Sequence, residues 1–155
     1  MSGRRGQVLK AMAVIRRPRD GALLVSGHAD PSMAPSHRPL GGHVEFGEYA
    51  EATVHREFAE EIGQALTDVV LLGVVENIFE WQGATAHEIV FLYSAAFRDP
   101  AAYEIAEQRI LDEADGMSRV VWRPPAATSP PLYPDGIADL CAAADAGPIP
   151  GQSSA

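Results

Sequence analysis

Short apolar runs separated by turn-forming residues occupy the start of the chain. Val8 to Arg17 is mainly apolar and contains the β-branched pair Val14 and Ile15, and Ala22 to Ser26 is a second apolar run. The residues between them supply a proline and an Asp-Gly step, which are typical of turns. The pattern therefore predicts a β-hairpin at the beginning of the fold.

An amphipathic helix is predicted from Glu48 to Ile62. At about 100° per residue, one stripe collects the apolar side chains Val54, Phe58, Ile62 and Ala65. Gly47 precedes the segment, and Gly63 follows it as a plausible C-terminal cap. We expect the apolar stripe to be buried against the rest of the domain.

More strands and one more helix are predicted downstream. Runs rich in Val, Leu and Ile indicate strands at residues 69–79, 87–97 and 119–122, with a turn at residues 80–84. Spacing at i, i+3, i+4 and i+7 predicts a final helix that contains Ile137, Leu140, Cys141 and Ala144. Residues 99–116 are ambiguous, because helix formers around residues 105–114 lack clear apolar spacing.

Three segments have no periodic pattern. Gly27 to Pro39 predicts a long loop, and such loops in compact domains are often functional. Five prolines between Pro124 and Pro134 predict an extended connector. Residues 147–155 are expected to form a loose tail, which leaves residues 1–146 as a single domain.

The composition fits one soluble domain of 155 residues, with 46% hydrophobic and 21% charged residues. Cys141 is the single cysteine, so no internal disulfide is expected, and Ala11–Ile15 is too short for a signal-peptide core. We therefore expect a cytoplasmic protein. The net charge of −9 argues against nucleic-acid or membrane partners.

The acidic charge is concentrated in the predicted helix and the residues before it. Six of the 12 glutamates lie between Glu45 and Glu61, and Arg56 is the one Lys or Arg among them. Glu57, Glu60 and Glu61 share one helical face, where like charges one turn apart destabilise a helix. A bound divalent cation reverses that effect, since Mg²⁺ and Mn²⁺ prefer carboxylate oxygens.

The spacing around these carboxylates resembles the Nudix box, G-x5-E-x7-R-E-U-x-E-E-x-G-U, where U is a bulky aliphatic residue. The segment from Gly42 to Gln64, which we call the box, matches at all seven fixed positions: Gly42, Glu48, Arg56, Glu57, Glu60, Glu61 and Gly63. It departs at Phe58 and Gln64, where aliphatic residues are usual, and at Leu40, where many members have proline. None of these departures changes a carboxylate.

The chain is thus similar to the MutT-like members of the Nudix hydrolase superfamily. The resemblance implies an α/β fold of the α+β type, with a mixed β-sheet sandwiched between α-helices. It also implies an enzyme that uses Mg²⁺ or Mn²⁺ to hydrolyse the phosphoanhydride bond of a nucleoside diphosphate linked to another group, by attack of water on phosphorus.

The family pattern implies roles for the matching residues. Glu57, Glu60 and Glu61 are expected to bind metal, with the Gly42 carbonyl as an additional ligand. Arg56 would orient Glu57, and Glu48 would support the loop or a metal-bound water.

Residues outside the box complete the candidate site. Family members differ in the general base, and Glu88, at the start of a predicted strand, is our candidate from outside the box; an exposed strand-end charge is the alternative. Arg38 and His43 are candidate phosphate ligands, and Trp81 could stack on a base. For these three, ordinary surface or hairpin packing roles remain open.

Two alternatives to catalysis remain. The first is a binding or sensing module for a nucleotide or sugar nucleotide on the same fold, and the second is a solvated acidic helix in an interaction protein. The sequence leaves open which nucleoside diphosphate derivative is the substrate, how many metal ions bind and whether the chain forms a homodimer.

Overall fold

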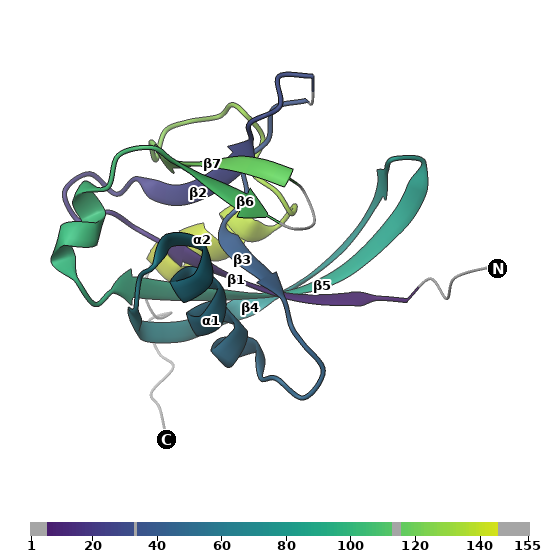
Figure 1. Ribbon diagram of the computed structural model, residues 1–155, viewed down its shortest axis with the longest axis horizontal. Coiled ribbons are helices and arrows are strands. Elements are labelled where there is room, and N and C mark those ends of the chain that lie inside the picture. Colours follow the sequence, from purple (N-terminus) through teal and green to yellow (C-terminus); the bar gives the residue numbers. More distant parts are fainter. Residues whose placement is uncertain (1–5, 33, 113–115, 146–155) are drawn as a thin grey trace.

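Two β-sheets and two α-helices build the fold in the computed structural model, which describes residues 6–32, 34–112 and 116–145 (Figure 1). The expected tail at residues 147–155 lies outside the described residues. One sheet has four strands in the order β3-β1-β5-β4: Leu40–His43, Val8–Ile15, Ala84–Phe97 and Leu66–Trp81. The other has three in the order β2-β7-β6: Leu23–His28, Gly116–Arg123 and Gln108–Asp112.

The predicted N-terminal hairpin is wrong. β1 pairs with β3 and runs parallel to β5, whereas β2 pairs with β7 in the other sheet. The two strands meet only at an isolated bridge between Arg16 and Leu23. The reason is burial: five consecutive residues, Ala11–Ile15, are buried, so both faces of β1 are covered as in a central strand.

β4 and β5 form a long antiparallel hairpin whose tip projects from the body of the molecule (Figure 1). Its turn consists of Gln82 and Gly83, both with positive φ (48° and 77°), which matches the twist of the flanking strands. The predicted strands 69–79 and 87–97 are confirmed and are longer than predicted at the turn end.

Helix α1 covers Ala50–Ile62 and confirms the amphipathic helix, although it begins two residues after Glu48. Gly63 ends it in the left-handed conformation (φ 68°), and its N–H donates to the carbonyl of Ala59 at 3.1 Å. Ala65 is exposed rather than part of the buried stripe, because the helix has already ended.

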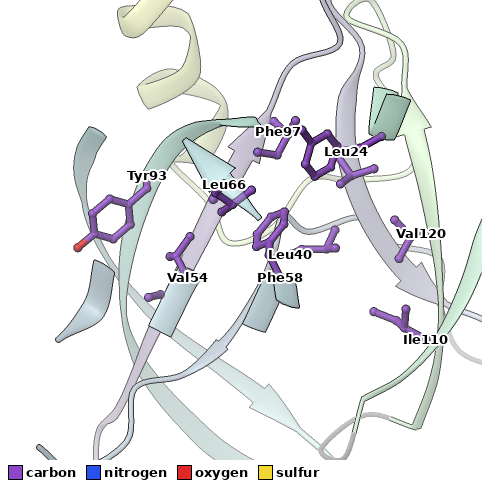
Figure 2. Close-up of a cluster of buried hydrophobic side chains, with 13 residues drawn as sticks. Leu24, Leu40, Val54, Phe58, Leu66, Tyr93, Phe97, Ile110 and Val120 are labelled. Atoms are coloured by element: carbon purple, nitrogen blue, oxygen red, sulfur yellow. The ribbon is translucent and has the colours of Figure 1, made fainter. Parts of the chain in front are cut away.

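The core consists of two clusters. One packs α1 against both sheets and includes Leu24, Phe58, Leu66, Phe97 and Val120 (Figure 2). The other packs the opposite face of the four-stranded sheet against α2, Ile137–Asp145, through residues that include Met12, Leu92, Ile137 and Cys141. A mixed sheet with helices on both faces confirms the expected fold class and the buried Cys141.

The ambiguous segment contains no α-helix in its described residues, 99–112 and 116. A short 3-10 helix, η1, covers Pro100–Glu104 and starts where the Asp99 side chain accepts a hydrogen bond from the Ala101 N–H at 3.0 Å. β6 follows and pairs with β7, so sheet pairing overrides the helix propensity of its residues. The predicted loop is also shorter than expected, since Gly27 and His28 belong to β2.

No helix among the described residues is long and apolar enough to span a membrane.

Candidate active site

Two glycines place the start of the box directly against its neighbours. A Cβ on Gly41 would overlap the Ala11 carbonyl and lie 2.7 Å from the Met12 Cα, so only glycine lets β3 approach β1 this closely. A Cβ on Gly42 would overlap the carboxylate of Glu57. Gly42 therefore leaves the space that the Glu57 carboxylate occupies.

Arg56 joins the carboxylates of the box. Its Nε and Nη2 donate to the two carboxylate oxygens of Glu48 at 2.8 and 3.0 Å, which is a bidentate pair. Its Nη1 donates to Glu57 at 3.0 Å and to Glu60 at 3.3 Å, and Nη2 also donates to the His43 carbonyl at 3.1 Å. We call Arg56, Glu48, Glu57 and Glu60 the box network.

The network keeps Glu48 ionised. Hydrogen bonds from Arg56 and from the Thr53 hydroxyl lower the pKa of Glu48 to about 2. The same carboxylate raises the pKa of Arg56 above its ordinary value. Glu48 thus holds the guanidinium in place, and the guanidinium in turn holds Glu57, which supports the expected positioning role of both residues.

The donor chemistry of the box fits a hard divalent cation. Glu57 and Glu60 share one nitrogen of Arg56, so their carboxylates already converge on a positive charge, and Glu61 lies half-buried on the same helix. Within the described part of the chain, no three His, Cys, Asp or Glu side chains are gathered as a metal site. The oxygens required by Mg²⁺ are present, but they face Arg56.

A cleft of about 560 Å³ lies between the two sheets. Arg38, Trp81 and Glu88, three of the residues that the sequence singled out, line it together. Lys10 forms part of its wall and pairs in register with His43, the residue after Gly42, so the cleft adjoins the first residues of the box. His43 is not among the residues that line the cleft.

Glu88 lies inside the cleft, five residues into β5, and not at a strand end as predicted. The strand starts earlier because the tight turn lets pairing continue to Trp81 and Ala84. Its carboxylate forms an ion pair with Lys10 at 2.7 Å, and both side chains are about 12% exposed. Glu88 is therefore a sheltered, paired carboxylate, and the exposed strand-end alternative does not hold.

Trp81 forms a stacked pair with His28, with ring centroids 5.7 Å apart and planes 15° apart. The His28 Nδ1 atom is buried and has no hydrogen-bond partner among the described residues. Trp81 is 37% exposed and lines the cleft, so part of its ring surface is available to a ligand, next to the His28 ring.

Sequence reasoning missed several cleft residues, among them Lys10, Asn77 and Tyr133. Lys10 carried one usable signal, because it is the single lysine of the chain. Asn77 and Tyr133 carried none, since they enter the cleft through strand register and through the connector that follows β7.

The family model of the NUDIX domain matches residues 6–140. The chain belongs to the Nudix family. Nudix hydrolases generally cleave pyrophosphate bonds in small-molecule nucleotide derivatives and generally use divalent metals such as Mg²⁺.

Solved structures agree with this assignment. The chain is similar to a MutT NUDIX hydrolase from Burkholderia pseudomallei, with 28% identity, a TM-score of 0.61 and coverage of 83% of this chain and 91% of that one. It is also similar to a NUDIX hydrolase from Nitrosomonas europaea, with 26% identity, a TM-score of 0.55 and coverage of 77% and 73%. The E. coli ORF135 protein shares the fold at 24% identity and a TM-score of 0.57, with coverage of 92% and 94%.

Proposed function

We propose that this Nudix protein is a metal-dependent hydrolase that cleaves the pyrophosphate bond of a nucleoside diphosphate linked to another group. The observation that carries the proposal is the box network, in which Arg56 holds Glu48, Glu57 and Glu60 beside the side-chain-free Gly42. A stability role alone does not explain this arrangement, because it places several carboxylates around one cation.

Glu57, Glu60 and Glu61 would hold Mg²⁺ or Mn²⁺, with the Gly42 carbonyl as a further ligand. The bound metal supplies charge neutralisation for the diphosphate and lowers the pKa of the attacking water. Arg56 keeps Glu57 oriented through their 3.0 Å hydrogen bond, while Glu48 keeps Arg56 in place. The protein's own contribution is thus to fix the carboxylates before substrate arrives.

The cleft would bind the organic part of the substrate and the phosphates nearest to it. Trp81 offers a surface for a base, Arg38 offers a cationic group for a phosphate, and His43 lies beside Lys10 where the cleft adjoins the box. A small anionic ligand fits this site, whereas the net charge of −9 disfavours nucleic acid and anionic membranes as partners.

Glu88 would act as the general base from outside the box. Its carboxylate is held 2.7 Å from Lys10 and is sheltered in the cleft wall, and a positioned carboxylate of this kind can accept a proton from water. A box glutamate is the alternative base, and a Glu88→Gln variant separates the two. If Glu88 is the base, the variant should lose the fall in kcat at low pH. If a box glutamate is the base, that fall should remain.

A product-resolved screen of nucleoside diphosphate derivatives with Mg²⁺ tests the proposal. We expect at least one compound to yield two phosphate-containing products, with turnover abolished by a chelator. Tight nucleotide binding by calorimetry without any product after long incubation would instead identify a binding module.

A further inference from the structure

The projecting hairpin of β4 and β5 has one markedly exposed apolar face. Side chains alternate along β4, so Val74 and Ile78 lie on one face, while Val75 and Asn77 lie on the other. Val74 and Ile78 are 52% and 61% exposed, whereas Val75 and Asn77 are half-buried. The hairpin's side chains are therefore partly buried on the cleft side and exposed to solvent on the opposite side.

The open face continues onto neighbouring elements of the same sheet. Val74 pairs with Phe91 in β5, and Ile89 pairs with Leu9 in β1. A shallow hollow lined by Leu9, Phe91 and Tyr49 joins this surface to the start of α1. We call this surface the arm face, and its members are Leu9, Tyr49, Leu71, Val74, Ile78, Ile89 and Phe91.

The arm face reaches the box network at one residue, because Glu48 lines the shallow hollow beside Tyr49. Glu51 lines the shallow hollow together with Phe91 and Tyr93, so this side of α1 lies above β5. The carboxylate of Glu57 faces Gly42 on β3, at the other side of the helix. An occupant of the arm face would cover the hollow beside Glu48, while the contact between Glu57 and Gly42 lies on another side of the helix.

The exposed area is large enough for a stable protein interface. Tyr49 is 86% exposed and Leu71 is 50% exposed. With the other members, the apolar area is on the order of 600 Å² by the usual side-chain areas. A standard interface buries about 800 Å² per partner, of which about 60% is apolar. This area lies at the upper end of the range of about 300–600 Å² for the largest apolar patch on a monomer, and such patches are often functional.

The charges of the chain narrow the choice of occupant. An anionic lipid surface is disfavoured by the net charge of −9. The chain ends that the structure does not describe, residues 1–5 and 146–155, contain only Met1 and Ile149 as large apolar residues, too few to cover the face. At its centre, the Glu76 carboxylate lies 3.1 Å from the His87 Nε2 atom, so it has a polar partner within the hairpin.

We propose that a second copy of this chain covers the arm face, forming a two-fold symmetric homodimer. In such a contact each copy presents the same patch, so the apolar side chains of one arm bury those of the other. β4 is also an outermost strand of its sheet, and exposed edge strands favour pairing with another chain. The inference does not depend on the hydrolase activity.

Sedimentation velocity of the full chain tests the dimer. We expect wild-type protein between about 1 and 100 µM to have twice the chain mass of 16.5 kDa, since interfaces of standard size reach micromolar affinity or better. Val74→Glu places a charge at the centre of the arm face and should give the monomer mass. Leu71→Glu, on the same face, provides an independent second variant if Val74→Glu does not fold.

Val70→Glu is the matched control. Val70 lies in the same strand and is 57% exposed, but it pairs with Ser94, which puts it on the opposite face from Leu71 and Tyr93. This variant should remain dimeric, with circular dichroism confirming the fold of all three. Wild-type protein that is monomeric throughout the concentration range would overturn the proposal, as would dimers that survive both arm-face variants. If the wild-type protein is monomeric, the occupant of the arm face is a protein of different sequence.

Discussion

The box network and the cleft differ in how far their charges are balanced. In the box network one guanidinium is shared among Glu48, Glu57 and Glu60, so negative charge is in excess. In the cleft wall Lys10 is matched by a single carboxylate, Glu88, and aromatic surface lies alongside. The first region is suited to additional cations. The second is closer to charge balance, with Lys10 and Arg38 against Glu80, Glu88 and Asp135 in its lining, and it offers aromatic surface to the organic part of a ligand. The two regions are connected by the backbone pairing of Lys10 in β1 with His43 in β3.

Removing a carboxylate from the box network should have the largest effect on activity. We expect Glu57→Gln to reduce kcat by about three orders of magnitude or more, because it removes a proposed metal ligand. Steady-state kinetics with a substrate from the screen measure the loss. Glu51→Gln, an exposed change on the same helix, is the control and should retain wild-type rates. Equal rates for the two variants would show that the box network is not the catalytic region.

Gly42→Ala tests the contact between β3 and the box network. The added methyl group would displace the Glu57 carboxylate, and we expect a loss of about 10- to 100-fold in kcat, as for other changes that disturb ligand orientation. Gly6→Ala, whose Cβ would meet nothing within 4 Å, is the control. Full activity in Gly42→Ala would mean that the packing of Gly42 on Glu57 is incidental.

Arg56→Lys tests whether the network also stabilises the fold. Lysine cannot make the bidentate contact with Glu48, so we expect the free energy of unfolding to fall by about 2 kcal/mol, the scale of hydrogen bonds to charged groups. Arg19→Lys, in an exposed pair with Glu104, should change it by less than about 0.5 kcal/mol. Denaturant titration measures both, and indistinguishable values would contradict the structural role of Arg56.

Trp81→Ala addresses the cleft alone. Loss of the stacking surface should raise KM by up to about 10-fold while kcat changes little, since ring contacts of this kind contribute about 0.5 to 1.5 kcal/mol. Trp81→Phe should recover most of the affinity. If instead kcat falls by a similar factor and KM is unchanged, Trp81 acts in the chemical step together with the box network.

The smallest effect concerns pH and His37, which lies between two residues that line the cleft, Ser36 and Arg38. Burial, and secondly the nearby charge of Arg123, lower the pKa of His37, whose Nδ1 lies 3.0 Å from the Arg123 guanidinium. The unfolded chain binds a proton at His37 near pH 6.5. The folded chain therefore loses stability as the pH falls below about 6.5 and through the lower folded pKa. The melting temperatures of the wild type and of His37→Gln should diverge as the pH falls through that range. If the two melting temperatures change with pH in parallel, His37 is not the source of the loss of stability.

The same two regions show what could be predicted from the sequence. The box is contiguous, so the periodicity of α1, its cap at Gly63 and the shared face of Glu57 and Glu60 follow from local spacing. The cleft gathers residues from both sheets, and its composition depends on strand register. The mistaken N-terminal hairpin has the same cause, because local turn chemistry does not reveal that β1 finds its partners in β3 and β5.

Single-turnover hydrolysis in isotopically labelled water tests the central claim most directly, namely that the box carboxylates support attack of water on phosphorus. With Mg²⁺ and a substrate from the screen, the wild-type protein should place one labelled oxygen on a phosphate group of one product, detected by mass spectrometry. Glu57→Gln should give almost no labelled product in the same time. Label on a group without phosphorus, or equal labelling by both proteins, would contradict the account.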